Sequence, residues 1–298
     1  MFRLMADSKG KSRANVVPTS VNLRGLTRVG AKPPFLDYLV ALWDYRHFVF
    51  FDAKANVQSG NSRDRLGSIW LILNPVLSGL TYYLIFGVLL QASRGVENFI
   101  GYLIIGVFLF QMSSRAISNG AKAIRSNLKV VQAFNFPRAT LLLSVNMREL
   151  LGSVPVVLAM FLLILLFPPE EQISWLWLLI VPALLLQTVL NLGVGLVLAR
   201  VVSKVNDISN LLSVALRFLM YGSCVIFPIT LFDQFPTIRA IIEWNPIYQM
   251  LTIVRQSVLY NELPAWESWA ILAAWALGFL AVGLVYFWNA EETYGRDQ

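Results

Sequence analysis

The sequence is poor in the residues that carry most catalytic and metal chemistry. Among its 298 residues there is one cysteine, Cys224, and one histidine, His47. A single cysteine allows neither a disulfide nor a cysteine-based metal site within the chain. No Asp-x-Asp pair occurs, so an enzyme that holds a metal with paired carboxylates would lack its usual ligands. The sequence therefore predicts no catalytic residue and no metal site.

Charge is scarce as well. Only 14% of the residues are charged, 57% are hydrophobic and the mean hydropathy is +0.62, which excludes an ordinary soluble surface. Apolar runs of about 20 residues, enough to cross about 30 Å of hydrocarbon, recur along the chain. We therefore expect an all-α polytopic membrane protein with six transmembrane helices at residues 69–91, 99–119, 139–167, 174–200, 208–232 and 268–288.

Positive charge is concentrated on one side of these six segments. The N-terminal region and the loop between the second and third segments are rich in Lys and Arg, whereas the opposite loops lean acidic. Because Lys- and Arg-rich loops stay in the cytosol, both termini are predicted to be cytoplasmic. Residues 1–34 are typical of a disordered basic arm, and residues 35–298 would form the transmembrane domain. The anionic membrane lipids of the inner leaflet explain the net charge of +7, and no nucleic acid is required.

Two segments outside the six runs have helical patterns on the cytosolic side. Residues 35–52 are amphipathic but too short and too charged to span, which is typical of a helix lying in the inner membrane interface. Residues 120–135 alternate apolar and basic positions and predict a short cytosolic helix that ends before Pro137. The alternative for this second segment is a basic loop that only enforces topology, and the pattern alone leaves both open.

The segment between the fifth and sixth runs is long and partly apolar. Residues 233–263 read as two short helices broken at Asn245-Pro246. A non-spanning element of this kind, a re-entrant hairpin, must pack on protein, because its broken backbone cannot face lipid. The hairpin is therefore a candidate outer gate.

Four stretches, taken in order, resemble motifs of ABC-2 type transport permeases. They are Arg65-Leu66-Gly67-x-x-Trp70 with Pro75, Phe134-x-Phe136-Pro137-Arg138, Gly193-x-Gly195-Leu196-x-Leu198-Ala199 followed by Asn206-Asp207-Ile208, and Asn245-Pro246 followed by Arg255. The likeness covers roughly residues 36–290 and points to the Wzm-like exporters of polysaccharide, O-antigen and teichoic acid. The C-terminal segment from Ala290 to Arg296 is similar to that of actinobacterial members, where a lipid-linked galactan is one such cargo. Asn206 departs from the family, which usually has Arg there.

The resemblance implies a homodimeric permease of the bacterial inner or plasma membrane. It would export a lipid-linked polysaccharide together with two copies of a separate ABC ATPase. ATP and Mg would be bound by that ATPase, because this sequence has no G-x-x-x-x-G-K-[ST] phosphate loop. The implied ATPase-coupling residues are Lys122, Ile124, Arg125, Leu128, Lys129, Trp43 and Arg46, and the outer-gate residues are Ile241, Ile242, Trp244, Asn245, Pro246 and Arg255.

A path for sugars would expose aromatic rings and hydroxyl groups, since sugar rings pack their C–H faces on aromatic planes. The candidates are Tyr82, Tyr83, Phe86, Phe108, Phe110, Arg115, Arg148, Phe218 and Tyr221. Core packing is the alternative for each aromatic residue. For Arg115 the alternative is snorkelling to a headgroup, and for Arg148 it is a salt bridge to Glu149.

Two other functions stay open at this point. One is a membrane-embedded transferase that acts on a lipid-linked sugar, and the other is a proton-coupled carrier in which Glu149 titrates. The transferase would need an acid or base near the interface, which this sequence hardly supplies. Uptake driven by a pH gradient without ATP would favour the carrier, and a neighbouring reading frame for an ATPase would favour export.

Overall fold

The computed structural model describes residues 33–59, 69–89, 95–96, 98–134, 136–167, 173–205 and 207–294. Every regular element in these ranges is helical, as the apolar runs predicted. The basic arm lies outside the described residues except for its last two, and so do Arg65 and Asn206. The division into an arm and a transmembrane domain therefore stays a prediction.

The helices follow one another without any strand in the described ranges. They are α1 (Phe35–Asp44), α2 (Arg46–Ser59), α3 (Trp70–Tyr82) with a π-helical extension (Tyr83–Leu89), α4 (Phe99–Ser126), α5 (Leu128–Ala133), α6 (Ala139–Leu166), a 3-10 turn (Trp175–Leu179) leading into α7 (Ile180–Lys204), α8 (Ile208–Gly222), a 3-10 turn (Ile229–Phe232), α9 (Pro236–Glu243), α10 (Pro246–Val258) and α11 (Trp266–Trp288).

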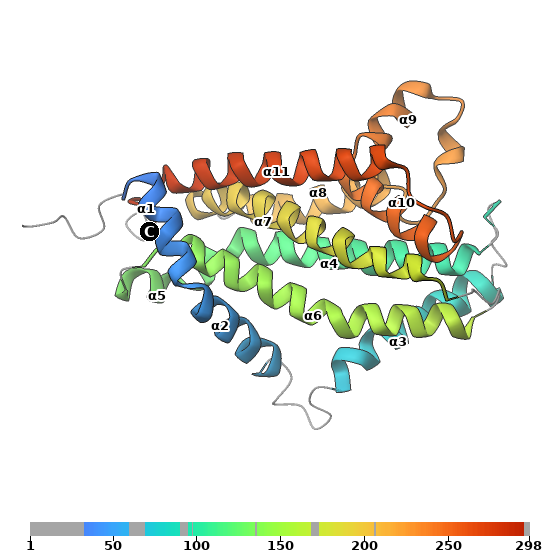
Figure 1. Ribbon diagram of the computed structural model, residues 1–298, viewed down its shortest axis with the longest axis horizontal. Helices are drawn as coiled ribbons and strands as arrows, with labels where there is room; N and C mark the ends of the chain where they lie inside the picture. The colour runs from blue at the N-terminus through green and yellow to red at the C-terminus, as the bar shows by residue number, and fades with distance from the viewer. Residues whose placement is uncertain are drawn as a thin grey trace, which may run out of the picture. The chain divides into compact units, whose positions relative to one another are not determined.

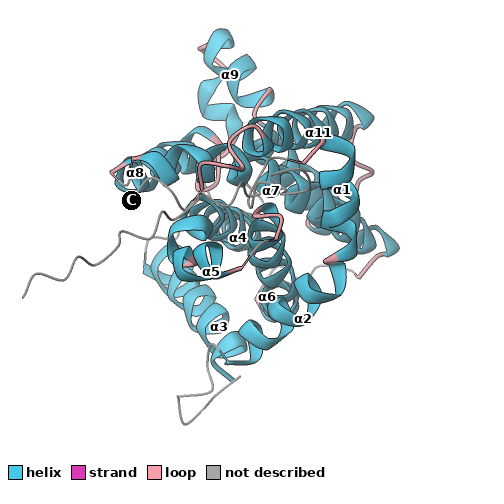
Figure 2. Cartoon of the chain, turned by 90° about the vertical axis from the view of Figure 1, so that its left-hand side faces the viewer, coloured by secondary structure: helices cyan, strands magenta, loops and turns pink. Residues whose placement is uncertain are grey.

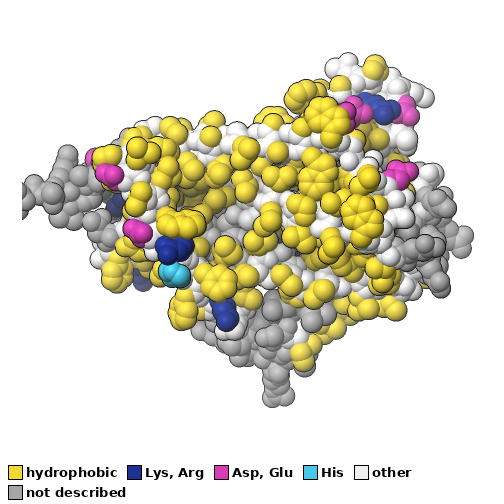
Figure 3. All heavy atoms as spheres, in the orientation of Figure 1, with side chains coloured by type: hydrophobic (Ala, Val, Ile, Leu, Met, Phe, Trp, Pro, Cys, Tyr) yellow, Lys and Arg dark blue, Asp and Glu magenta, His cyan; other side chains and the backbone are white. Residues whose placement is uncertain are grey.

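Four of these helices are long and apolar enough to cross a membrane. They are Phe99–Ser126, Ala139–Leu166, Trp175–Lys204 and Trp266–Trp288, and they run side by side along the long axis in Figure 1. On the face seen in Figure 3, charged side chains of described residues lie toward the two ends, and hydrophobic or uncharged ones cover the middle. The polytopic, all-helical class is thus supported by length and composition, while the count of six spans stays a prediction.

The fifth predicted segment is shorter than expected. Helix α8 ends at Gly222 instead of continuing to residue 232, and a turn and the Ile229–Phe232 element follow. At 1.5 Å per residue its 15 residues extend about 22 Å, less than the hydrocarbon thickness. Cys224 has a left-handed φ of 51° in this turn, a conformation that continues no helix.

Small residues bring α7 into close contact with two other spans. A β-carbon at Gly193 would collide with the backbone of α11 at Phe279 and Leu280. Gly195 faces α4, where its Cβ position lies 3.7 Å from the Cα of Gly120. Without a hydrophobic force between helices in lipid, such close backbone packing is a main source of association. The Gly193-x-Gly195 motif therefore places α7 between α4 and α11.

The two segments predicted to be cytosolic differ from the expected single helices. The interface segment is divided at Tyr45, because α1 packs on the end of α11 through Phe35 and Trp288, whereas α2 packs on α6. The second segment is mostly a continuation of α4, which runs to Ser126 instead of ending at 119. The Asn127 side chain then donates a 2.9 Å hydrogen bond to the carbonyl of Ala123 and caps the helix. Only α5 is a separate helix, and it ends before Pro137 as predicted.

Candidate functional site

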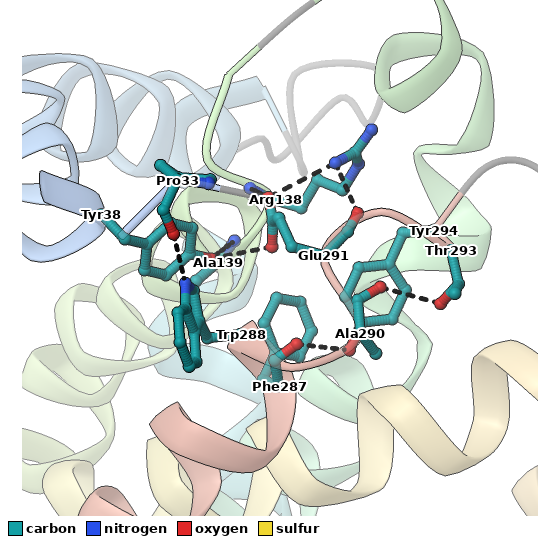
Figure 4. A network of polar contacts seen from close by, with 10 residues as sticks. All are labelled: Pro33, Tyr38, Arg138, Ala139, Phe287, Trp288, Ala290, Glu291, Thr293 and Tyr294. Carbon is teal, nitrogen blue, oxygen red and sulfur yellow. Dashed lines mark hydrogen bonds and ion pairs between the residues drawn. The ribbon is translucent and has the colours of Figure 1, made fainter. Parts of the chain in front are cut away.

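A buried polar junction joins α1, the start of α6 and the chain that follows α11 (Figure 4). The hydroxyl of Tyr38 donates to Glu291 Oε2 at 3.0 Å and accepts from the backbone N–H of Ala139 at 3.3 Å. The backbone N–H of Arg138 donates to Glu291 Oε1 at 2.8 Å. The Arg138 guanidinium donates to the Glu291 carbonyl at 2.6 Å and lies 3.5 Å from Oε1. One carboxylate thus connects three chain segments, and we call these residues the inner junction, after the side that the charge pattern predicts for them.

Burial sets the electrostatics of the inner junction. Glu291 is only 4% exposed, and burial raises the pKa of its carboxyl, while the hydrogen bonds and charge of Arg138 oppose that rise. The pKa of Tyr38 is raised by burial and by the negative charge of Glu291, so its hydroxyl remains a donor. The carboxyl group of Glu291 is therefore held by directed hydrogen bonds from Tyr38 and Arg138.

Aromatic contacts complete the inner junction. The indole N–H of Trp288 donates to the carbonyl of Pro33 at 3.0 Å, and the Phe35 ring lies edge-on to Trp288 at 5.2 Å. Phe287 and Tyr294 stack at 4.5 Å, and the Tyr294 hydroxyl donates to the Phe287 carbonyl at 3.2 Å. Packed rings and hydrogen bonds therefore join α1 to the start of α6 and to the end of α11. From the sequence, Arg138 and Glu291 were singled out only as members of motifs. The signal that could have identified Glu291 is an acidic residue placed directly after the last apolar run.

The predicted ATPase-coupling residues divide into exposed and buried ones. Lys122 and Lys129 are exposed, and Arg125 and Leu128 are half-buried. Ile124 is 2% exposed and packs in the core beneath them. On α1, Trp43 is exposed, and the Arg46 guanidinium lies 5.3 Å from its ring. Figure 2 looks onto this end of the molecule, where α1 and α5 lie in front of the span ends.

A cavity of about 400 Å³ lies between α3, α4 and the end of α8, and we call it the lateral cavity. It brings together three of the predicted path residues, Tyr82, Phe110 and Arg115. The other lining residues are Leu103, Val107, Gln111, Ser114, Met220 and Ile226. Gln111 and Arg115 are exposed although they lie in a helix apolar enough to span, and Arg115 forms no ion pair with a described residue.

The remaining path candidates lie elsewhere. Tyr83 stacks on Phe167 with ring centroids 4.0 Å apart, and Phe108 is 2% exposed within the core, so neither lines the lateral cavity. Phe218 and Tyr221 are exposed on α8. The side chain of Phe86 lies outside the described part of the chain.

Arg148 and Glu149 belong to a polar contact between spans. Arg148 donates to Glu149 Oε1 at 3.3 Å, and Asn119 of α4 donates to the same oxygen at 2.9 Å. The charges are therefore paired within the protein. This pair is the salt bridge that was the alternative to a place for Arg148 in the sugar path. A carrier that depends on an unpaired Glu149 gains no support from this arrangement.

At the opposite end of the spans, the α9–α10 hairpin satisfies its broken backbone with protein groups. Asn245 caps α10 by accepting from the Ile247 N–H at 2.9 Å, and Pro246 occupies the first turn. The Asn245 amide also donates to the Gly222 carbonyl at 3.1 Å and to Ser223 Oγ at 2.9 Å. The indole N–H of Trp275 donates to the Trp244 carbonyl at 2.9 Å. The hairpin break therefore lies against the end of α8 and against α11.

The predicted gate residues have unequal surroundings. Ile242 is 5% exposed, whereas Ile241 and Trp244 are 68% and 65% exposed. Arg255 is 3% exposed. Its guanidinium donates to the carbonyls of Cys224, Val225 and Tyr102 at 3.1, 3.0 and 3.2 Å, and it lies 3.3 Å from the centroid of the Tyr102 ring. We call this set the outer clasp, after the side predicted for the hairpin, and it fastens α10 to α4 and to the turn after α8.

A family model for the ABC-2 type transporter matches residues 54–259, more than two thirds of the chain. The chain belongs to the ABC-2 type transporter family. It is a membrane permease subunit of a transporter rather than an enzyme, as predicted, and ATP hydrolysis in this family is the task of a separate chain.

This chain aligns with most of the length of several curated relatives. The O-antigen export system permease protein RfbA of Klebsiella pneumoniae is 25% identical over 225 residues, which is 74% of this chain and 83% of that protein. RfbA of Myxococcus xanthus is 23% identical over 256 residues, 85% and 93% of the two chains. The polysialic acid transport protein KpsM of Escherichia coli is 25% identical over 232 residues, 76% and 87%.

Proposed function

We propose that this permease exports a lipid-linked polysaccharide from the cytoplasmic to the outer side of a bacterial inner membrane. In this proposal two copies of the chain form the membrane part and two copies of an ABC ATPase bind ATP and Mg. The names of the relatives, an O-antigen exporter and a polysialic acid transporter, support a glycan as cargo. Six spans and cytoplasmic termini belong to the same proposal, supported by the Lys- and Arg-rich segments at one end.

The exposure of Arg115 and Gln111 in the lateral cavity is the observation that carries the proposal. A charged side chain in a spanning helix normally faces water or a partner, because exposure to hydrocarbon costs about 3 kcal/mol or more. In the described residues Arg115 has no ion-pair partner. A second copy of the chain facing α3 and α8 would enclose the cavity and leave a polar, aromatic-lined path between the copies. The exposed apolar residues Leu77, Leu211 and Phe218 would supply the contact.

The mechanism we propose is a population shift driven from the inner end. The ATPase would dock on the exposed Lys122, Lys129 and Trp43. Its closure would push α1 and the end of α4, and the inner junction would carry that push to α6 and α11. In this proposal the path between the copies then opens, with the outer hairpin as its gate.

The test is ATP-driven export by the full complex in proteoliposomes or in cells that lack the chromosomal permease. We expect the wild-type chain with its ATPase to move lipid-linked glycan outward only when ATP is hydrolysed. Arg115→Gln should slow export by about tenfold, equivalent to about 1.4 kcal/mol of lost interaction along the path. Lys54→Gln, which removes an exposed positive charge on α2 away from the cavity, the proposed docking residues and the hairpin, is the control and should export normally.

Two results would contradict this proposal. Transport driven by a pH gradient without ATP would identify a carrier instead. Normal export by Arg115→Gln, with the protein inserted and folded, would place the path away from the lateral cavity.

A further inference from the structure

A second cavity, of about 490 Å³, lies at the hairpin end of the molecule, and we call it the outer pocket. The start of α4, the turn around Thr230, α10 and the chain after it form its walls. It shares no lining residue with the lateral cavity. Its volume lies within the range of about 300–1,000 Å³ that is usual for small-ligand sites.

The lining of the outer pocket is rich in hydroxyl groups and aromatic rings. It includes Tyr102, Tyr248, Tyr260, Thr230 and Thr252. The hydroxyls of Tyr102 and Thr252 already donate to backbone carbonyls and can accept a hydrogen bond from a ligand, and each ring offers a flat apolar face. A sugar ring has the complementary features, since its hydroxyls exchange hydrogen bonds and its C–H faces pack on aromatic planes.

Two buried polar atoms of the lining lack hydrogen-bond partners among the described residues. They are Oε1 of Gln256 and Nε of Arg255, and both residues line the outer pocket. A buried polar atom without a partner costs about 1–3 kcal/mol, so a side-chain rotation that turns these two atoms toward a ligand with one donor and one acceptor would be favoured. The exposed Tyr260 and Glu262 lie at the accessible side of the pocket.

The charges decide between a neutral and an ionic ligand. Arg255 carries one positive charge and Glu262 one negative charge, so the formal charge of the lining is zero. The Arg255 charge is already compensated by three backbone carbonyls. A phosphate or pyrophosphate group would therefore meet one guanidinium, that of Arg255, whose charge is already compensated, and one carboxylate, that of Glu262, which repels it. A neutral polyhydroxylated ring meets no such conflict.

We propose that the outer pocket binds a neutral sugar ring of the exported glycan on the outer side of the membrane. The inference rests on the proposed function, because it takes the emerging glycan as the source of the sugar. A sugar held there would disfavour backward movement of the glycan between two cycles of the ATPase.

The experiment uses full-length permease in phospholipid nanodiscs and saturation-transfer NMR. The probes are the methyl glycosides of galactose, glucose and mannose, with inorganic phosphate as the anionic probe. At least one glycoside should bind, and Gln256→Leu and Thr252→Val should each weaken it by about tenfold, because each removes hydrogen-bonding groups at nearly unchanged volume. Gln234→Leu and Thr237→Val, exposed positions of the hairpin that do not line the pocket, are the matched controls and should bind as the wild type does.

Each other outcome overturns the inference. Failure of every glycoside to bind the wild-type chain, or equal binding by both pocket variants, excludes a sugar site here, and binding of phosphate alone makes it an anion site. Export by the complete complex separates the two proposals. If wild-type complex exports glycan but binds no glycoside, only the outer pocket fails. If it exports no glycan with ATP, the proposed function fails, whatever the nanodisc result.

Discussion

Arg138 and Arg255 lie near opposite ends of the spans and are neutralised in different ways (Figure 1). Arg138 contacts a carboxylate, Glu291, which also accepts from Tyr38. Arg255 has no carboxylate partner in the described residues and donates to three backbone carbonyls instead. The inner junction therefore contains a partner that can titrate, whereas the outer clasp uses backbone carbonyls and the ring of Tyr102.

This difference bears on which part of the hairpin could act as a gate. The outer clasp binds α10 to α4 and to the turn after α8, so movement of α10 would break several hydrogen bonds at once. Helix α9 is less tightly held, with Ile241 and Trp244 exposed. We therefore expect α9 to be the moving element if the hairpin opens, and α10 to stay with the spans.

Breaking the outer clasp should give the largest effect on stability. Arg255→Met would remove the donors to the Val225 and Cys224 carbonyls while keeping much of the apolar stem. Because each buried acceptor without a donor costs about 1–3 kcal/mol, we expect a loss of about 3 kcal/mol and a clearly lower thermal unfolding temperature in detergent. Arg255→Lys should recover only part of it, since an ammonium cannot reproduce the planar fork of donors.

Two further variants separate the clasp from general damage to the hairpin. Gly106→Ala would place a methyl group against the Val225 carbonyl and the Arg255 guanidinium, and should destabilise through the same contacts. Arg239→Met removes a half-exposed arginine that pairs with Asp233 and Glu243 at the surface, and should leave the unfolding temperature unchanged. Equal effects of Arg255→Met and Arg239→Met would mean that the clasp contributes no special stability.

Breaking the inner junction should cost less than breaking the clasp. Glu291→Ala removes the acceptors of the Tyr38 hydroxyl and the Arg138 N–H, for an expected loss of about 1–3 kcal/mol. Arg138 would keep its 2.6 Å hydrogen bond to the Glu291 backbone carbonyl, which limits the damage. A double-mutant cycle with Tyr38→Phe, measured by thermal unfolding, should show coupling between the two side chains. Asp44→Ala, an exposed acid at the same end, is the control, and additive effects of Tyr38→Phe and Glu291→Ala would contradict the proposed network.

The two arginines also illustrate which features of the structure the sequence could predict: those set by side chains were predictable, and those set by backbone groups were not. Apolar runs predicted α4, α6, α7 and α11, because burial in lipid requires about 20 apolar residues and leaves that pattern. The break at Asn245-Pro246 was predicted from turn chemistry, since Asn caps and Pro begins a helix. These features depend on side chains that are visible in the sequence.

Features that depend on the backbone were missed. The partners of Arg255 are carbonyls, which every residue has, so no pattern distinguishes Cys224 or Val225 as acceptors. The early end of α8 at Gly222 is followed by more apolar residues, and hydropathy continues across it. The lateral cavity gathers residues from three helices, and a linear pattern does not tell which aromatic faces it, as Phe108 and Phe110 illustrate.

The smallest expected effect concerns pH, and it tests whether the inner junction differs from the clasp in being titratable. Burial raises the pKa of Glu291 above its usual value of 4.5, so the folded protein holds this proton more tightly than the unfolded chain does. The contribution of Glu291 to stability is therefore fully present below the unfolded pKa and falls as pH rises through the folded pKa. Glu291→Gln cannot titrate at this position. Thermal unfolding of both proteins at several pH values above 4.5 should show the wild type losing stability relative to Glu291→Gln as pH increases.

Arg255→Met, compared with the wild type in the same series, should show a difference that does not change with pH, because its partners are backbone carbonyls. A wild-type curve parallel to that of Glu291→Gln would mean that the Arg138 contacts fully offset the burial of the carboxylate.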